Sequence, residues 1–272
     1  MPFQFAGLAV SGFSLPGSGR FAFGKIVVLL LGLGLAGCAT APTQVAPEAA
    51  SKVKTVGVIS AIGDSLNYEQ VAITAFSNDL FVKPAREYGI DAYVNDLIAR
   101  ALGKRYEVRP VKYDPVAFAP DKVSFSEDSD EALGKIVRAQ AMPNDLDAYV
   151  VVLSASSGID VTNQVASGLG IARRAMAFYH LHWAHALYGI AVVDGHSGKV
   201  LAWHGAPGGQ QKLGFLETPA LAGPYLDVDE TYWPEDPEQI GDAQAKKLAD
   251  LLKDLIAQSM NGALQESGLL PQ

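Results

Sequence analysis

Hydrophobic residues recur along this chain in patterns that distinguish strands from helices. The segment VKTVGVISAI, residues 53–62, is β-branched or apolar at nearly every position, which predicts a strand buried on both faces. DAYVVVLSAS, residues 147–156, is the strongest strand candidate. Further strands are expected in EQVAITAF (69–76), YEVRPVKYD (106–114), GLGIARR (168–174), ALYGIAVVD (186–194) and KVLAWHG (199–205). Pro110 favours an edge position or a bulge for the strand that contains it.

Three other stretches repeat their apolar residues with helical spacing. GIDAYVNDLIARALGKR (89–105) and SDEALGKIVRAQ (129–140) predict two early helices, and residues 236–268 predict a long C-terminal helix. The turn DGHSG joins the last two strands into an antiparallel hairpin, whereas residues 206–235 are expected to be mostly loop. The order predicts one α/β domain with a mixed sheet, two early helices, a late antiparallel hairpin and a closing helix.

The N-terminal apolar block has a different character. KIVVLLLGLGLAGC places a basic residue before a short apolar run, which is followed by small residues and the only cysteine of the chain, Cys38. This is the layout of a secretory signal peptide, and the run is short for a transmembrane helix. Leu35-Ala36-Gly37-Cys38 resembles the lipobox of bacterial lipoproteins. The resemblance implies cleavage before Cys38 and acylation of that cysteine by chains such as palmitate.

The lipoprotein resemblance implies a layout and a location. Residues 1–37 would be the signal peptide, 38–52 a lipidated flexible tether rich in Ala, Pro and Thr, and 53–272 a periplasmic α/β domain. Ala39 in place of aspartate implies the outer membrane, with the domain on its periplasmic face. The order of elements is also similar to small periplasmic α/β domains of outer-membrane lipoproteins that assist secretion channels or cell-wall synthases. The overall sequence resembles proteobacterial periplasmic lipoproteins that have no assigned activity.

Charge narrows the classes of partner. The chain has a formal net charge of −8, and an acidic domain repels the phosphates of nucleic acids and anionic lipid headgroups, which argues against membrane binding through a basic surface. We therefore expect no nucleic-acid partner. GLG at 168–170 lacks the second half of a dinucleotide-binding motif, so no cofactor is expected. The membrane, reached through the N-terminal lipid, and an envelope protein remain as partners.

Gly63-Asp64-Ser65-Leu66 resembles the signature of the GDSL, or SGNH, serine hydrolases, and Ser65 follows a predicted strand as their nucleophile does. That family also requires a Gly-x-Asn-Asp block after a later strand and an Asp-x-x-His block near the C-terminus. No histidine here has an aspartate three residues before it, and the strand at 147–156 ends without an asparagine. Catalysis by Ser65 would need a base in contact with its hydroxyl. The alternative is a turn that Gly63 and Asp64 form, with Ser65 capping it.

YHLHWAH contains a second candidate site. His180, His182 and His185 are imidazole ligands of the kind that zinc, copper or nickel prefer, although no further ligand frame accompanies them. Phe178, Tyr179 and Trp183 instead suggest an adhesive surface for a partner or for the membrane interface. The third alternative is a packed hairpin loop at 175–185.

These patterns lead to one functional hypothesis and one rival. The hypothesis is a lipid-anchored, non-enzymatic periplasmic module with a binding or assembly role. The rival is a lipid-anchored esterase that uses Ser65.

Overall fold

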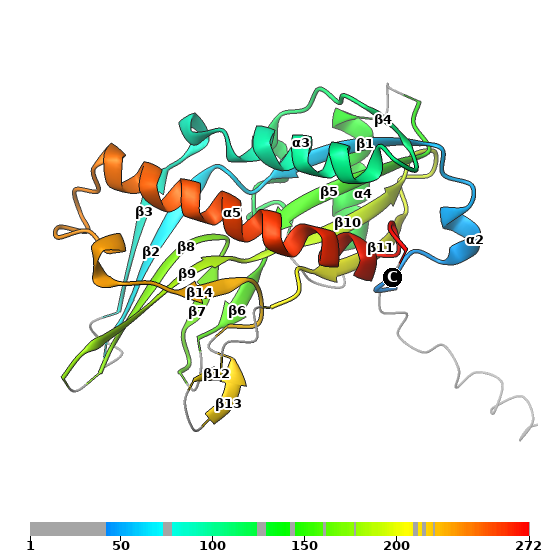
Figure 1. Cartoon of the computed structure of the whole chain (residues 1–272). Helices are drawn as coiled ribbons and strands as arrows, with labels where there is room; N and C mark the ends of the chain where they lie inside the picture. The colour runs from blue at the N-terminus through cyan, green and yellow to red at the C-terminus, as the bar shows by residue number, and fades with distance from the viewer. Residues whose placement is uncertain are drawn as a thin grey trace, which may run out of the picture. The chain divides into compact units, whose positions relative to one another are not determined.

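A computed structural model describes residues 42–72, 78–123, 129–141, 145–159, 162–176, 178–208, 212–213, 216–219 and 221–271. They form an α/β domain with two mixed sheets, which confirms the expected fold class (Figure 1). The sequence patterns suggested one sheet, and the structure has two main ones. Within the described residues no helix is both long enough and apolar enough to cross a membrane.

The first sheet, sheet A, holds the strands that the sequence patterns predicted best. Its order is β11-β10-β5-β1-β4, with β1 parallel to β4 and β5, and β10 antiparallel to β5 and β11. Its strands are β1 (Thr55–Ala61), β4 (Glu107–Arg109), β5 (Ala148–Ser154), β10 (Tyr188–Asp194) and β11 (Val200–Gly205). The edge position of β4, directly before Pro110, agrees with the expectation.

The second sheet, sheet B, has the order β14-β9-β8-β2-β3. Its strands are β2 (Ser65–Val71), β3 (Asp79–Pro84), β8 (Leu169–Ala175), β9 (His180–Ala186) and β14 (Tyr225–Asp227). β2 is parallel to β8, and the other pairs are antiparallel. β2 begins four residues before the predicted strand 69–76, and residues 73–76 of that prediction lie outside the described part.

At two places the chain passes directly from a strand of one sheet into a strand of the other. β1 continues into β2 after residues 62–64, and β9 continues into β10 after the single residue Leu187. The junction is closed by backbone hydrogen bonds: the Ala155 N–H donates to Leu187 O, Leu187 N–H to Gly168 O, and Gly168 N–H to Ala155 O. Gly168 has a φ of 62°, a conformation that favours glycine. Side chains at this junction are therefore positioned by strands of both sheets.

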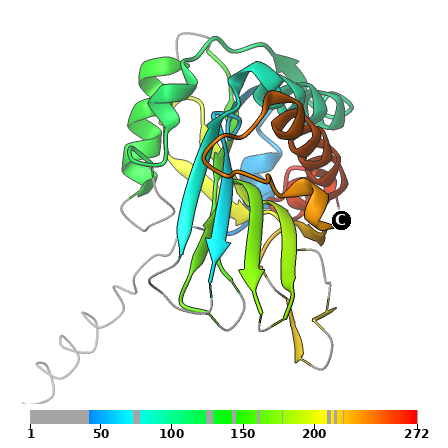
Figure 2. The ribbon, with the colours of Figure 1, turned by 90° about the vertical axis from the view of Figure 1, so that its left-hand side faces the viewer.

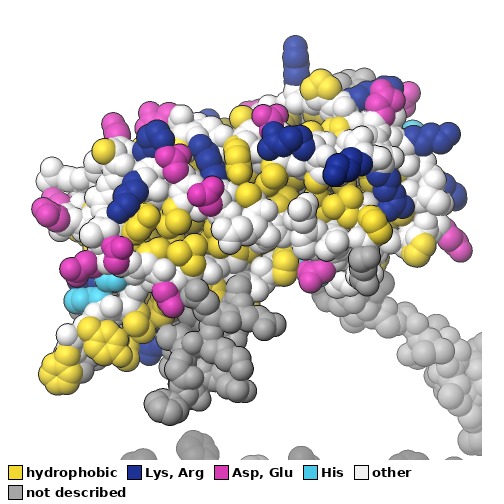
Figure 3. All heavy atoms as spheres, in the orientation of Figure 1, with side chains coloured by type: hydrophobic (Ala, Val, Ile, Leu, Met, Phe, Trp, Pro, Cys, Tyr) yellow, Lys and Arg dark blue, Asp and Glu magenta, His cyan; other side chains and the backbone are white. Residues whose placement is uncertain are grey.

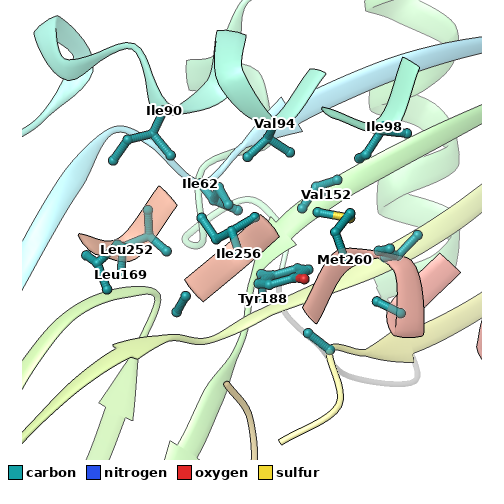
Figure 4. Close-up of a cluster of buried hydrophobic side chains, with 14 of the residues drawn as sticks. Ile62, Ile90, Val94, Ile98, Val152, Leu169, Tyr188, Leu252, Ile256 and Met260 are labelled. Carbon is teal, nitrogen blue, oxygen red and sulfur yellow. The ribbon is translucent and has the colours of Figure 1, made fainter. Parts of the chain in front are cut away.

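The helices cover sheet A on both faces (Figures 1 and 2). α3 (Ile90–Leu102) and α5 (Asp242–Glu266) pack on one face, while α4 (Ser129–Gln140) and the 3₁₀ helix Pro115–Phe118 pack on the other. α5 extends further and also contacts β8 and β9 of sheet B. Figure 4 shows the core between α3, α5 and the junction, where Ile98, Tyr188 and Ile256 are each almost fully buried. Helical apolar stripes therefore pair with sheet faces as their spacing predicts.

Short elements complete the domain. They are α2 (Pro47–Ala50), the 3₁₀ helices Arg86–Tyr88 and Glu230–Tyr232, and the strand pairs β6 (Ser156–Gly158) with β7 (Val165–Ser167) and β12 (Lys212–Leu213) with β13 (Leu216–Pro219). The expected loop at 206–235 thus contains β12, β13, β14 and a helical turn. The turn at 194–198 has the expected form, since Asp194 accepts hydrogen bonds from His196 N and Ser197 N and Gly198 has a φ of 71°.

The start of the described chain packs on the domain. Val45 and Ala50 are buried, the Trp203 N–H donates to Pro42 O, and the Val45 N–H donates to Ser267 O beyond the end of α5. The packed structure therefore includes residues 42–52, which the composition of the sequence assigned to the flexible tether.

Candidate functional site

Ser65 is the first residue of β2, where the chain passes from sheet A to sheet B. Its neighbours serve structural roles. The Gly63 N–H donates to the Asp91 carboxylate at the start of α3, and Arg86 donates to both oxygens of Asp64. Ser65 itself pairs with Pro84 on β3. The Gly-Asp pair thus makes the bend that was expected of a turn, whereas Ser65 lies in the strand that follows it.

The five histidines lie in different surroundings, and none of the described hydrogen bonds connects a histidine to Ser65. His180 contacts Arg173, His185 contacts Glu69, His196 lies 3.5 Å from Asp147, and His204 lies 3.4 Å from Glu266. His182 lines a hollow beside α5. β8 lies between β9 and β2 in sheet B, and His185, the β9 histidine that reaches a side chain of β2, contacts Glu69 and not Ser65. The described geometry thus provides Ser65 with no base.

The histidine segment is a strand and not the hairpin loop that was one of its interpretations. β9 covers His180–Ala186, so His180 and His182 share one face and His185 lies on the other. Arg173 on β8 is paired with His182 and donates from its Nη2 to His180 Nε2 at 3.0 Å. The segment is a strand and not a loop because it pairs with β8 on one side and with β14 on the other.

A metal site at these histidines finds no support in the described structure. The described residues include no group of three or more His, Cys, Asp or Glu side chains that could hold an ion. Because a guanidinium only donates, His180 Nε2 must accept from Arg173, so this lone pair is already used. His185 faces away from His180 and His182.

The three aromatic candidates differ in how far their side chains are exposed. Phe178 is 98% exposed and Tyr179 56% exposed at the turn between β8 and β9, whereas Trp183 is fully buried. Trp183 packs with Val71, Ala172 and Tyr225 on the face of sheet B that is opposite to α5. Trp183 is therefore a core residue and not part of a contact surface, which leaves Phe178 and Tyr179 for that role.

A hollow of about 1050 Å³ opens between sheet B and the N-terminal half of α5. The side chains around it come from β8, β9, the segment 230–239 and α5, and they include Arg173, His182, Glu230, Trp233, Glu235, Asp236 and Lys247. The segment 230–239 is held by Asp229, which accepts from the Thr231 N–H, and by Lys247, which donates to Thr231 Oγ1. The hollow is thus built from the β8–β9 hairpin and from a later stretch of the chain, residues 230–247, that is distant from the hairpin in sequence.

Among the described residues, several buried donors at or behind this wall have no hydrogen-bond partner. Arg173 Nε and Trp233 Nε1 are enclosed and make no hydrogen bond, and the same holds for the hydroxyl of Tyr68, whose ring meets Trp233 edge to face at 6.1 Å. The Arg173 guanidinium lies over the Trp233 ring at 5.5 Å. Buried donors that lack acceptors are costly, and a site that binds an acceptor-rich group is one setting in which they occur.

The electrostatics of the wall favour a neutral His182. Burial lowers the pKa of His182, and the positive charge of Arg173 and the neighbouring His180 lower it further. Glu230 and Asp229 oppose this effect more weakly. At neutral pH, Arg173 and Lys247 therefore supply the positive charges of the hollow, while Glu230, Glu235 and Asp236 supply negative ones.

One polar pair was not anticipated from the sequence. His185 Nε2 lies 3.0 Å from Glu69 Oε2, with the two side chains 0% and 9% exposed, at the junction of the sheets. His185 Nδ1 donates to Gly168 O, and Glu69 Oε1 accepts from the Ser167 N–H. Since Gly168 O only accepts, Nδ1 carries a hydrogen, and one further proton must lie between His185 Nε2 and Glu69. No spacing signal could reveal this pair, because 116 positions separate its members.

Cys38 and the lipobox lie outside the described residues, so the structure does not bear on the anchor. Comparison with models of known protein families gives no match, and neither does comparison with curated proteins. The functional assignment of this chain therefore depends on its own residues.

Proposed function

We propose that this protein is a lipid-anchored module on the periplasmic face of the outer membrane that binds a partner or ligand and does not catalyse a reaction. The hollow beside α5 carries the binding part of the proposal. It is open, it has buried donors without acceptors, and it combines charges of both signs with an aromatic wall.

The lipobox pattern carries the anchoring part. Basic residue, short apolar run, small residues and cysteine occur in that order before a domain whose described residues contain no membrane-spanning helix. An envelope protein that presents acceptor groups, such as backbone carbonyls or carboxylates, would suit the cationic side chains of Arg173 and Lys247 that line the hollow.

The test compares three forms of the protein in its own membranes: the unaltered chain, Arg173→Ala and Arg109→Ala. Arg109 is the matched control, because it is an exposed arginine on β4 of the other sheet, paired with Glu107. After cross-linking and capture, we expect a bound species that is lost with Arg173→Ala and kept with Arg109→Ala. Species that are captured equally by all three forms would show that the hollow is not the binding site.

The anchor is tested separately with Cys38→Ala. Mass spectrometry should find acylated Cys38 at the N-terminus of the mature protein, and the variant should lose membrane retention. An unacylated, uncleaved N-terminus in the unaltered chain would contradict the anchor.

A further inference from the structure

The tip of the β8–β9 hairpin is the most exposed apolar feature of the described domain. Phe178 is 98% exposed and Tyr179 56% exposed, and the turn is closed by a hydrogen bond from Met176 N–H to Tyr179 O. Figure 3 shows aromatic side chains projecting at the lower left, beyond histidine side chains. Two adjacent exposed aromatic side chains contribute little to the core and are available for a contact outside the domain.

The charge of the hairpin differs from that of the whole chain. No Asp or Glu occurs between Asp160 and Asp194, although the protein is acidic overall. Arg173 and Arg174 on β8 and His180 on β9 flank the tip. Aromatic residues beside arginines suit the headgroup region of a phospholipid bilayer, where the ring enters the apolar boundary and the cations meet phosphates.

The length of chain before the domain restricts where a bilayer can be. The Trp203 N–H donates to Pro42 O, so the packed structure begins by Pro42. Only four residue steps separate Pro42 from Cys38, which is a reach of at most about 14 Å. An acylated Cys38 would keep the domain against the membrane surface.

We infer that the β8–β9 tip inserts Phe178 and Tyr179 into the interface of the bilayer that holds the anchor. This inference rests on the proposed lipid anchor. Figure 1 shows α2 near one end of the domain and the β8–β9 hairpin at the other, so two contacts with one membrane make the domain lie along the surface. The hollow, whose wall includes Arg173 of the same hairpin, is then held next to the bilayer.

Site-specific labelling tests the contact. Cys38 is the only cysteine and its sulfur is acylated in the anchored protein, so Phe178→Cys introduces a single reactive thiol. Val116→Cys, in an exposed 3₁₀ helix that packs on sheet A, is the matched control. Both positions are labelled with an environment-sensitive nitrobenzoxadiazole dye in vesicles of phosphatidylethanolamine and phosphatidylglycerol.

We expect the dye at position 178 to show blue-shifted emission and at least twofold quenching by spin-labelled lipids, with neither effect at position 116. Equal exposure of both positions to water would overturn the inference. Disulfide-linked dimers of the unlabelled Phe178→Cys variant would also overturn it, because they would identify a second copy of the chain as the occupant. Circular dichroism checks that the variants are folded, which the exposure of Phe178 favours.

Retention of the labelled protein in carbonate-washed vesicles tests the lipid anchor independently of the tip contact. Retained protein with a water-exposed label at 178 contradicts only the tip contact. Protein that proves unacylated contradicts the anchor. In that case the same two labels in a Cys38→Ser background, added to the same vesicles, decide whether the tip binds lipid.

Discussion

At the scale of single residues, the buried pair of Glu69 and His185 has the largest predicted effect. Each atom of the pair that can form a hydrogen bond has a partner, and the two side chains share one proton. Such a pair stabilises the fold little by itself, but removal of one member leaves the other buried without compensation.

We expect Glu69→Ala to lower the free energy of unfolding by about 3–5 kcal/mol. Glu69→Gln should cost about 1 kcal/mol, because the amide accepts from Ser167 N–H and donates to a neutral His185. Urea denaturation of both variants measures the difference. If glutamine costs as much as alanine, the pair is ionised and its charge is essential.

Ser65 illustrates how a local motif depends on distant partners. Since Ser65 begins β2 and no described hydrogen bond connects it to a histidine, Ser65→Ala should cost at most about 1 kcal/mol. A fluorophosphonate probe should not label the unaltered protein, and short-chain p-nitrophenyl esters should not be hydrolysed. Labelling that disappears in Ser65→Ala would instead support the hypothesis of an esterase that uses Ser65.

At the scale of elements, α5 connects the two sheets. It packs against α3 and contacts strands of both sheets, so its buried stripe supports the core and one wall of the hollow. Leu252 is fully buried in this stripe, whereas the neighbouring Leu251 is only half-buried.

Leu252→Ala should lower the free energy of unfolding by about 3 kcal/mol, because it removes buried methyl groups and leaves a cavity. Leu251→Ala makes the same change in helix propensity and should cost about 1 kcal/mol. Thermal unfolding of the two variants separates burial from helix propensity. Equal losses would mean that α5 is packed less specifically than the structure shows.

At the scale of the whole molecule, the two ends of the domain pack together. Residues 42–52 contact the segment after α5, and the hydroxyl of Tyr106 donates to Leu269 O in the same region. The chain between the proposed anchor and the domain is therefore short, which is what limits the distance to the membrane.

A chain beginning at residue 53 should be less stable than one beginning at residue 42 by about 2 kcal/mol, because Val45 and Ala50 leave the core. In the longer chain, Val45→Ala should reproduce part of this loss, and Glu48→Ala, which changes an exposed side chain, should not. Denaturant unfolding of the four proteins is the measurement. Equal stability of the two chains would show that residues 42–52 belong to the flexible tether and not to the packed domain.

Local patterns in the sequence predicted β1, β5, β10, β11 and the three main helices, because burial on one or both faces repeats with the period of each element. The same patterns predicted the α/β class and the turn at Asp194. Of the three aromatic residues that the sequence suggested as an adhesive surface, Phe178 and Tyr179 are exposed in the structure, and their contact with a partner stays a prediction.

Only the tertiary structure decided the division into two sheets, since that depends on β1 and β9 continuing past Gly63 and Leu187 into new partners. It also decided that His180–Ala186 is a strand, that Trp183 is buried, and that Glu69 meets His185. The hollow likewise combines β8, residues 230–239 and α5. Each of these features arises from contacts between residues far apart in the chain, and local periodicity carries no information about which distant elements will meet.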